Sequence, residues 1–417
     1  MSRLIAVSKP KITTITLGCR FNFYESEVMK MITNRTDNAD NVVIINTCAV
    51  THEAERQSKQ AVRKAIRKNV DAKIVVTGCA ARTAKDYFRK LDGVFDVIQN
   101  ENKEQLDISQ AYWSTPHLFE DRARAFLQIQ NGCDHCCTYC IVPFTRGRSK
   151  SLSPEIILKQ VEYFLRFGFN EIVLSGIDIA SYGKDIGEGN LNLFSVIEMI
   201  LEKTHIAGTR IRLSSIDPAA VDRDLLSLFS SETRIMPHFH FSIQSGSNDV
   251  LKAMKRRHSR ENVIEICEYI RGQRSCVAIG GDIITGFPME TEAMFEETVK
   301  LVDDAKLALL HVFPYSVRSG TVAASMVNLP KNIIRSRANK LREKVKSAKR
   351  ALLQSFVGTI TSGLIEKSKD SVSIGKTDSY IPFRLNGSFR VGEVIHDFTV
   401  IDVTEDDPEL MLVCIRE

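Results

Sequence analysis

The stretch NGCDHCCTYCIVPFTRGRS at residues 131–149 contains four cysteines within eight residues and directly follows a predicted strand, AFLQIQ. The cysteines form either one C-x3-C-x2-C pattern through Cys133, Cys137 and Cys140, or two adjacent C-x2-C pairs that include Cys136. Zinc sites usually place about a dozen or more residues between two such pairs. Cluster cysteines often come from one tight loop, which can reach several corners of a compact iron–sulfur cube. The spacing therefore favours an iron–sulfur cluster on Cys133, Cys137 and Cys140, with Cys136 as a spare thiol.

On the C-terminal side of this loop, short apolar strands alternate with helices. The strand candidates are EIVLSG, RIRLSSID, HFHFSIQSG, AIGGDIITGFP and ALLHVFPYS, and helical stretches such as PEIILKQVEYFLRFG lie between them. About six such repeats, counted with AFLQIQ, predict a partial or open parallel barrel over residues 120–330. In such a barrel the functional groups collect at the C-terminal ends of the strands, and polar and glycine residues stand at these ends here.

Residues 1–112 are predicted to form a separate parallel α/β domain. Its strand candidates ITTITLGC, NVVIINTC and KIVVTGC are separated by polar helical stretches, and each ends on a cysteine: Cys19, Cys48 and Cys79. Parallel strands place their C-terminal ends on one edge of the sheet, so the three thiols can meet there. For a single free thiol, burial as a small hydrophobe is the commoner explanation. Three thiols in the same phase favour a second metal cluster.

The C-terminal part of the chain changes composition twice. Residues 331–355 are predicted to form a basic connecting helix, because residues 331–350 hold nine Lys or Arg and one acid. Its apolar residues recur at steps of four and three, so a solvated helix face explains the charges as well as a polyanion-binding surface does. Residues 356–417, with the runs VSIGKT, FRVGEVIHDFTVIDVT and LMLVCI, are predicted to form a small all-β barrel. From residue 357 on, eleven acids outnumber six bases, so RNA binding there would need a local patch.

Composition limits the remaining classes of protein. The 417 residues are 43% hydrophobic with a formal net charge of +5, and this length suits two or three domains. The sequence contains no run of about 18 uncharged apolar residues and no charged-then-apolar leader, so we expect a cytoplasmic protein without a membrane segment. Ten cysteines in such a chain favour metal or redox chemistry over disulfides. We also expect a monomer.

The C-x3-C-x2-C loop, with the aromatic Tyr139 before its last cysteine, resembles that of the radical S-adenosylmethionine superfamily. The resemblance implies three thiolates on a four-iron cluster, which leave one iron open to the amine and carboxylate of S-adenosylmethionine. It also implies that an electron from the reduced cluster cleaves the sulfonium to give a 5′-deoxyadenosyl radical, chemistry that belongs to the cofactor. The barrel predicted downstream is the fold that this superfamily uses.

The resemblance covers nearly the whole chain and is to the methylthiotransferases, which combine an N-terminal three-cysteine domain, a radical barrel and a C-terminal TRAM-type β-barrel. It implies a second cluster on Cys19, Cys48 and Cys79 that carries the sulfur to be inserted. The expected cofactors are therefore two 4Fe–4S clusters and S-adenosyl-L-methionine, with a low-potential electron donor as a partner. One S-adenosylmethionine would supply the methyl group, and another the radical that abstracts hydrogen from an unactivated C–H bond.

Several blocks match the family's barrel pattern, among them LSGIDIASYG, RLSSIDP, HFHFSIQSGSNDVLKAMKRRH, DIITGFPMETE and HVFPYSVRSGT. By position, the blocks and the cysteine loop predict contacts with S-adenosylmethionine from seven residues: Tyr139, Ser175, Gly176, Asp178, Arg212, Ser214 and Gln244. An ion pair at the end of the barrel is the alternative explanation for Arg212 and Asp178.

Two further features of these blocks lead to expectations. The basic run Lys255, Arg256 and Arg257 is predicted to approach RNA phosphate, because Lys and Arg supply most sequence-independent affinity for nucleic acid. A solvated surface is the alternative. Met289 stands where the family more often has glycine, so we expect the turn after Pro288 to differ.

Three segments, GCRFNFYESEVMK, INTCAVTHEAERQSKQAVRK and GCDHCCTYCIVPFTRGRSKS, are most similar to enzymes that methylthiolate N6-threonylcarbamoyladenosine at position 37 of tRNA. The resemblance implies carbon 2 of a flipped-out adenine as the target, and Arg20, Asp134 and His135 favour this substrate. Competing subfamilies act on isopentenyladenosine at the same position or on an aspartate of a ribosomal protein. A third class, a zinc or iron–sulfur RNA-binding module without enzymatic activity, leaves the six barrel repeats unexplained.

Overall fold

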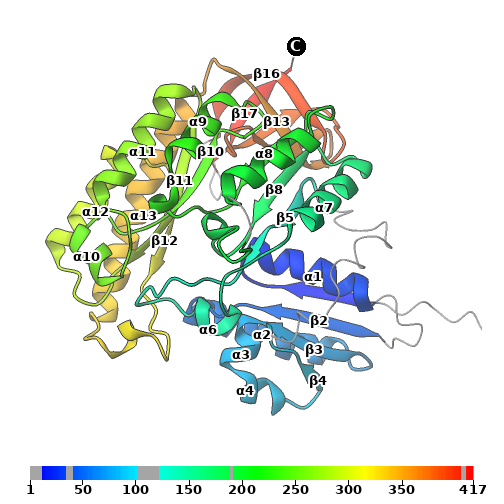
Figure 1. Ribbon diagram of the computed structural model, residues 1–417, viewed down its shortest axis with the longest axis vertical. Coiled ribbons are helices and arrows are strands. Elements are labelled where there is room, and N and C mark those ends of the chain that lie inside the picture. Colours follow the sequence, from blue (N-terminus) through cyan, green and yellow to red (C-terminus); the bar gives the residue numbers. More distant parts are fainter. Residues whose placement is uncertain (1–11, 34–40, 101–121, 188–190, 405–409, 417) are drawn as a thin grey trace, which may run out of the picture. The chain divides into compact units, whose positions relative to one another are not determined.

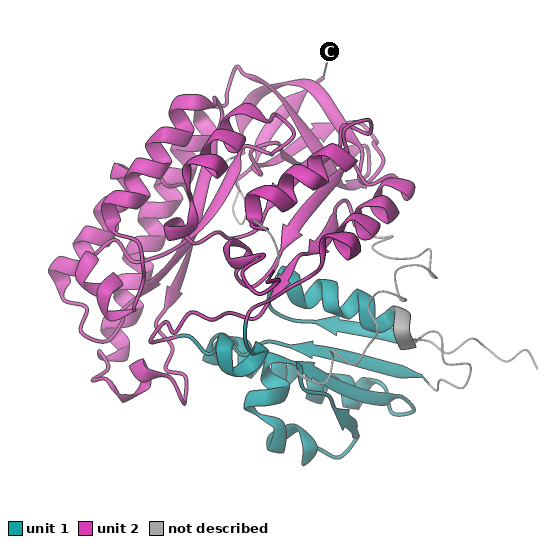
Figure 2. Ribbon diagram, in the orientation of Figure 1, with its two compact units in different colours: residues 1–118, 140–148 teal, residues 119–139, 149–417 magenta. Residues whose placement is uncertain are grey.

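The computed structural model describes residues 12–33, 41–100, 122–187, 191–404 and 410–416. The chain forms two compact units (Figure 2). Unit 1 comprises residues 1–118 and 140–148, and unit 2 comprises residues 119–139 and 149–417. The cysteine loop is thereby divided, because Cys140 belongs to unit 1 whereas Cys133, Cys136 and Cys137 belong to unit 2. Within unit 2, the strand–helix repeats, the basic helix and the small barrel pack together.

Unit 1 is built on a four-stranded parallel sheet with the order β1-β2-β3-β4. Its strands are β1 (Ile12–Thr16), β2 (Val42–Thr47), β3 (Lys73–Gly78) and β4 (Val94–Val97). The first three are the predicted strands, and β2 is buried along its whole length, as expected for a central parallel strand. β4 is not among the predicted strands, because its run VFDV is short and is interrupted by the acidic Asp96.

The helices of unit 1 are α1 (Arg20–Thr33), α2 (His52–Lys68), α3 (Cys79–Thr83), α4 (Lys85–Arg89) and α6 (Val142–Arg146). At the start of α2, the Thr51 hydroxyl accepts the backbone N–H of Ala54, and two glutamates in the first turn favour the same helix end. One stripe of α2, with Val62 and Ala65, is buried in the apolar core against the sheet. The amphipathic pattern therefore fixes which face of α2 covers the strands.

Unit 2 contains the predicted strand–helix repeats in the predicted order (Figure 1). Its long strands are β5 (Ala125–Gln128), β8 (Glu171–Ser175), β9 (Arg210–Leu213), β10 (His238–Gln244), β11 (Ala278–Thr285) and β12 (Leu309–Pro314). Its helices are α7 (Pro154–Arg166), α8 (Leu193–Lys203), α9 (Arg223–Ser231), α10 (Asn248–Ala253), α11 (Arg260–Gln273) and α12 (Glu292–Asp304). Short 3-10 turns are η2 (Ile179–Ser181), η3 (Pro218–Ala220) and η4 (Val322–Ser325). The two short strands β6 (Gln130–Asn131) and β7 (Lys150–Ser151) pair across the base of the cysteine loop.

The six long strands keep their sequence order but form two parallel sheets, β5-β8-β9 and β10-β11-β12. Between β9 and β10 the described residues form only isolated bridges, such as that of Ile216 with Phe241. The prediction of an open, partial barrel is therefore confirmed. Along β10, buried Phe239, Phe241 and Ile243 alternate with half-buried polar residues, so the polar side chains share the opposite face of the strand.

The basic helix is α13 (Lys331–Gln354), which packs along α12 and β12 (Figure 1). The predicted apolar stripe is confirmed, because Ile334, Ala338, Leu341 and Val345 are buried. Three of the nine cations pair with acids on or just before α12: Arg337 binds Glu290 and Glu292, Lys340 binds Glu296, and Lys344 binds Asp303. These cations fasten two helices together, which the sequence pattern did not indicate.

The C-terminal residues form a closed five-stranded barrel with the strand order β13-β14-β15-β17-β16. The strands are β13 (Ile360–Lys369), β14 (Val372–Thr377), β15 (Pro382–Asn386), β16 (Val394–Val403) and β17 (Leu412–Ile415). The barrel is filled by side chains such as Ile365, Phe383, Phe398 and Leu412. The runs assigned to β14, β16 and β17 are confirmed. β13 and β15 are additional strands, because only the centre of β13 is buried and β15 begins with a proline.

A buried ion-pair network connects this barrel to the N-terminal ends of the central strands. Glu171, the first residue of β8, is fully buried and contacts Arg124, Arg210 and Arg212. Arg210 also binds the carboxylate of Asp378, a residue of the C-terminal barrel, at 2.7 Å. The small barrel therefore packs at the strand ends opposite to those where a parallel barrel places its functional groups.

In the described part of the chain, no helix is long and apolar enough to cross a membrane.

Candidate functional site

The three cysteines predicted for unit 1 all lie at the C-terminal edge of its sheet. Cys19 stands between β1 and α1, Cys48 directly follows β2, and Cys79 begins α3 directly after β3. Gly18 shows how closely two of these segments approach, because a Cβ atom on Gly18 would lie 2.7 Å from Cβ and 2.8 Å from Sγ of Cys48. Both Gly18 and Gly78 have a φ of 91°, which glycine adopts readily. The glycines before Cys19 and Cys79 thus let the backbone turn sharply at the sheet edge.

Two asparagines that the sequence analysis did not single out organise this edge. Asn22, on the first turn of α1, donates to the carbonyls of Leu17 and Thr47, at 2.7 and 3.1 Å. Its side-chain oxygen lies 3.8 Å from Sγ of Cys19. Asn46 donates to the backbone carbonyl of Asn22 at 2.9 Å. Asn22 therefore ties the ends of β1 and β2 to the helix that follows Cys19.

The environment of the thiols fits a metal cluster. Cys48 and Cys79 are buried and Cys19 is exposed, so the set is partly open to solvent. Burial raises the pKa of the Cys48 thiol to about 11, so in the metal-free chain this thiol keeps its proton at neutral pH. Thiols bind metals as thiolates, so cluster binding would release such protons. Three soft sulfur donors, with a buried cation at Arg146 in the same unit, suit an anionic iron–sulfur cluster.

In the cysteine loop, each of the three predicted ligands accepts a hydrogen bond at its sulfur. The backbone N–H of His135 lies 3.4 Å from Sγ of Cys133, and that of Val142 lies 3.4 Å from Sγ of Cys140. The Arg256 guanidinium donates to Sγ of Cys137 at 3.6 Å. Hydrogen bonds to the sulfurs are among the features that tune protein-bound clusters. Cys136 differs, because it is exposed and its own thiol donates weakly to the Asp134 carbonyl at 3.9 Å.

Two residues of the loop hold it on the barrel of unit 2. The backbone N–H and hydroxyl of Thr138 donate to the carbonyls of Met254 and Ala253, at 3.2 and 2.9 Å, and its own carbonyl accepts the N–H of Ala323. Tyr139 packs against an apolar cluster that includes Phe287. The aromatic position of the loop is thus a packing anchor, and contact of Tyr139 with S-adenosylmethionine stays a prediction.

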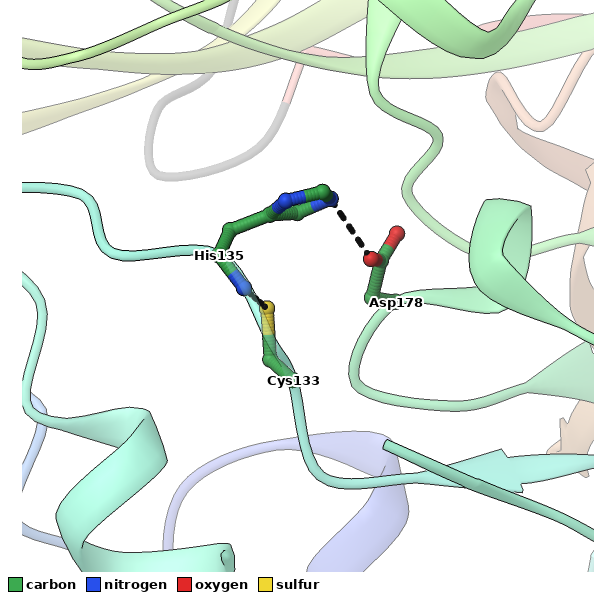
Figure 3. Close-up of side chains that lie close together, drawn as sticks. All are labelled: Cys133, His135 and Asp178. Carbon is green, nitrogen blue, oxygen red and sulfur yellow. Dashed lines mark hydrogen bonds and ion pairs between the residues drawn. The ribbon is translucent and has the colours of Figure 1, made fainter. Parts of the chain in front are cut away.

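Asp178 and His135 face each other beside Cys133 (Figure 3). Nε2 of His135 lies 2.9 Å from Oδ2 of Asp178, and Ser181 donates to the same carboxylate at 2.6 Å. Burial tends to raise the pKa of Asp178, but the hydrogen bonds from His135 and Ser181 outweigh it and lower the pKa. The loop that carries Asp178 is held by Gln130, whose side-chain oxygen accepts its backbone N–H at 2.8 Å. One ligand atom from each of Cys133, His135 and Asp178 lies within 4.8 Å of the others, so these three residues could hold a single metal ion.

Ser175 and Ser214 stand at the C-terminal ends of neighbouring strands β8 and β9, as predicted. The Ser214 backbone N–H binds the Leu174 carbonyl at 3.0 Å, which keeps the two strand ends in register. Both serine hydroxyls are buried, and neither has a hydrogen-bond partner among the described residues. Buried hydroxyls are nearly always hydrogen-bonded. Two orphaned hydroxyls on adjacent strand ends therefore fit a polar ligand such as the ribose or methionyl part of S-adenosylmethionine.

Gly176 and Gln244 also occupy the strand ends. A Cβ atom on Gly176 would lie 2.9 Å from the carbonyl oxygen of Gln130, so no larger residue fits there without a shift. Gln244 ends β10 with a φ of 71° at an irregularity in the strand pairing. Their contacts with S-adenosylmethionine stay predictions. Met289 has a φ of 75°, so the methionine occupies a left-handed conformation that glycine adopts more easily.

For Arg212 and the basic run, the observed contacts are those of structural residues. Arg212 is completely buried, with Nε 2.8 Å from Glu171 and a guanidinium hydrogen bond to the Asp378 carbonyl. This is the ion-pair alternative, and it does not support binding of S-adenosylmethionine by Arg212. In the basic run, the Arg256 side chain is 7% exposed and binds Asp217 at 3.1 Å. Arg257 binds Asp217 at 2.9 Å. The phosphate-binding expectation therefore lacks support at both arginines.

A further polar group lies on the described strands of unit 2 and was not singled out from the sequence. Nε2 of His240 on β10 and Nδ1 of His311 on β12 lie 3.1 and 3.2 Å from Oδ1 of Asp282 on β11. Burial tends to raise the pKa of Asp282, but the two imidazoles outweigh it and hold the pKa well below its usual range. On β10 the signal in the sequence is the alternation that places His240 on a polar face. Asp282 and His311 share their strand faces with apolar residues such as Ile284 and Phe313, so the sequence gives no such signal for them.

Family models match both the strand–helix repeats of unit 2 and the N-terminal three-cysteine domain. Residues 127–302 match the model of the radical SAM superfamily, and residues 11–99 match that of the uncharacterized protein family UPF0004. The solved structure of the radical S-adenosylmethionine methyltransferase TsrM from Kitasatospora setae has a TM-score of 0.51 and 13% identity, and the match covers 73% of this chain and 68% of that chain. At this identity the likeness concerns the fold alone.

Full-length relatives are closer in sequence. The threonylcarbamoyladenosine tRNA methylthiotransferase MtaB of Rickettsia prowazekii is 41% identical over 410 residues, which cover 94% of this chain and 96% of the relative. The tRNA-2-methylthio-N(6)-dimethylallyladenosine synthase of Staphylococcus haemolyticus is 33% identical, with 87% of this chain and 77% of the relative covered. The chain therefore belongs to the methylthiotransferase family of the radical S-adenosylmethionine superfamily, whose members use S-adenosylmethionine and 4Fe–4S clusters.

Proposed function

We propose that this protein is the tRNA methylthiotransferase that replaces the hydrogen on carbon 2 of N6-threonylcarbamoyladenosine 37 with a methylthio group. The observation that carries the proposal is the 41% identity to the Rickettsia threonylcarbamoyladenosine enzyme, which extends over nearly the full length of both chains. The dimethylallyladenosine enzyme is less similar and is covered over a smaller share of its length. Isopentenyladenosine 37 is therefore the second candidate substrate.

Two sets of cysteines have separate roles in this proposal. Cys133, Cys137 and Cys140 would hold the cluster that binds S-adenosylmethionine, and Cys19, Cys48 and Cys79 would hold the second cluster. When bound, these groups supply a carbon-centred radical and the sulfur atom to be inserted. The N–H donors at Cys133, Cys137 and Cys140 support the C-x3-C-x2-C set over the paired C-x2-C alternative, because Cys136 is the exposed member of the loop.

The residues of unit 2 would position S-adenosylmethionine rather than react themselves. Ser175 and Ser214 offer buried hydroxyls at two neighbouring strand ends, and Gly176 lets the backbone between them pack closely against Gln130. Asp178 is held in one orientation by His135 and Ser181, so its carboxylate is preorganised to accept hydrogen bonds. Arg212 is left out of this set because Glu171 and Asp378 already occupy its guanidinium.

We infer that the exposed stripe of α13 contacts tRNA. Lys331, Arg335, Arg342 and Lys346 lie on one side of the helix by its 3.6-residue period, and all are exposed. The cations that pair with acidic residues of α12 and the preceding turn lie on another side. A stripe of this kind suits a phosphate backbone. Because tRNA is a cytoplasmic substrate, we place the protein in the cytoplasm, where a low-potential donor would reduce its clusters.

The substrate is tested by mass spectrometry of tRNA nucleosides from a host that lacks this modification. We expect methylthio-threonylcarbamoyladenosine to appear when the chain is expressed and to disappear in the Cys133→Ala variant. Methylthio-isopentenyladenosine instead would establish the second candidate. Unchanged tRNA together with a methylthiolated ribosomal-protein aspartate would overturn the tRNA proposal.

A further inference from the structure

Residues 140–148 follow the radical-cluster loop in sequence but fold into unit 1. Their short helix α6 is fixed there by polar contacts of two of its residues. The Thr145 carbonyl accepts a hydrogen bond from Asn100 at 2.8 Å, and the same Asn100 amide lies 3.9 Å from Sγ of Cys79. The other is Arg146, the last residue of α6. The segment therefore brings a cation to the sheet edge that carries the cysteines of unit 1.

Arg146 is one of the most enclosed charges of unit 1. Its side chain is 1% exposed, and one nitrogen lies 2.5 Å from the side-chain oxygen of Asn22. A second nitrogen lies 3.1 Å from Glu25, and the guanidinium stands over the Phe21 ring at 4.2 Å. All three partners lie on the first two turns of α1, directly after Cys19. Asn22 links the cation to the thiol, because its oxygen also lies 3.8 Å from Sγ of Cys19.

The charge of Arg146 is coupled to these thiols as well as to Glu25. Burial tends to lower the pKa of Arg146, but Glu25, Cys79 and Cys19 together outweigh it and raise the pKa. The guanidinium is thus charged at every relevant pH. Three thiolates around a 4Fe–4S core leave a cluster with net negative charge, and each added electron makes the charge more negative. A fixed cation nearby stabilises the reduced state more than the oxidised state, since net charge and hydrogen bonding set cluster potentials.

We propose that Arg146 is a positioning residue that acts as the fixed counter-charge of the N-terminal cluster and raises its reduction potential. The inference rests on the proposed assignment of that cluster to Cys19, Cys48 and Cys79. Glu25 is the opposite charge of the same pair, so its removal should act in the opposite direction. If the pair only holds α6 against α1, removing Arg146 and removing Glu25 should not shift the reduction potential in opposite directions.

The test uses the full chain with Cys133, Cys137 and Cys140 changed to alanine, so that only the N-terminal cluster remains. Iron content comes first, because a chain without iron would show that the assignment of the three cysteines is wrong. Redox titration monitored by electron paramagnetic resonance then compares Arg146→Gln, Arg146→Lys and Glu25→Gln with this background.

We expect Arg146→Gln to lower the midpoint potential, Glu25→Gln to raise it, and Arg146→Lys to stay near the background value. Potentials that do not change, or that move in the same direction in Arg146→Gln and Glu25→Gln, would overturn the proposal. If Arg146→Gln binds no iron, Glu25→Gln decides: a raised potential supports the counter-charge role, and an unchanged potential refutes it.

Discussion

At the scale of single residues, Gly18 and Gly147 separate two effects of a glycine. Both have a positive φ, of 91° and 77°, a backbone region that glycine alone adopts readily, so alanine at either position costs about 1–3 kcal/mol of backbone strain. Only Gly18 is also crowded, because its added Cβ would meet Cys48, whereas a Cβ on Gly147 would meet nothing within 4 Å. We expect Gly18→Ala to cost a further ~1–3 kcal/mol through overpacking and to lower N-terminal iron. Amide hydrogen exchange in β1 and β2, with iron analysis, measures both. Equal effects of the two variants would argue against a tight thiol edge.

The neighbouring residues Cys136 and Cys137 of the cysteine loop should differ in whether they bind the radical cluster. Cys136 is exposed, whereas Cys137 accepts a hydrogen bond from the nearly buried Arg256 side chain. We expect Cys136→Ser to keep the iron content and the reductive cleavage of S-adenosylmethionine, and Cys137→Ser to lose the radical cluster and this cleavage. Loss of iron in Cys136→Ser would instead favour the paired C-x2-C arrangement.

At the scale of elements, Glu171 at the start of β8 binds the arginines that connect the central strands to the C-terminal barrel. Glu171 balances three buried arginines, so Glu171→Gln leaves buried positive charge without its carboxylate. Removing one partner from such a network costs about 3–5 kcal/mol. We expect a clearly lower urea midpoint for unit 2 in Glu171→Gln. The control is Glu162→Gln, which removes the acid of an exposed ion pair between α7 and α8 of unit 2, and it should leave the midpoint nearly unchanged.

The ionisation of Glu171 should make the free energy of unfolding depend on pH. Burial tends to raise the pKa of Glu171, but Arg212, Arg124 and Arg210 outweigh it and hold the pKa far below its ordinary range. As the pH falls below the ordinary glutamate value of about 4.3, the unfolded chain binds a proton that folded Glu171 does not. The free energy of unfolding should therefore decrease in acid and stay flat above that range. Urea midpoints between neutral pH and about pH 3 measure this. If the free energy of unfolding of a Glu171→Gln chain decreases in acid as steeply as that of the wild type, groups other than Glu171 cause the pH dependence.

Helix α13 has two kinds of cation, and they predict different effects on tRNA binding. Lys331 and Arg335 belong to the exposed stripe, whereas Lys340 and Lys344 pair with acids of α12. Changing Lys331 and Arg335 to Gln should weaken tRNA binding and lower the slope of log affinity against log salt by roughly 1–2, one for each lost phosphate contact. The Lys340→Gln, Lys344→Gln double variant removes the same charge and should change the slope less. Equal slopes in both double variants would exclude the stripe as the tRNA contact.

At the scale of the whole molecule, the sequence predicts what depends on local pattern. Strands such as β2 and β10 show clear apolar runs or alternation, and the three cysteines of unit 1 share one position relative to their strands. Partners far apart in sequence are not visible in such patterns. Arg212 stands at a family position on β9, yet only the fold brings Glu171 and Asp378 to it. The placement of Arg146 beside Asn22, 124 residues away in sequence, likewise required the structure.

The central claim is that one chain holds two clusters on two separate sets of three cysteines. Its most direct test is the iron and zinc content of the reconstituted wild-type chain, of the Cys19, Cys48, Cys79 triple alanine variant, and of the Cys133, Cys137, Cys140 triple alanine variant. We predict about eight irons in the wild type and about four in each variant, without bound zinc, since each 4Fe–4S cluster contributes four. A variant that keeps the full iron content, or tightly bound zinc in place of iron, would contradict the claim.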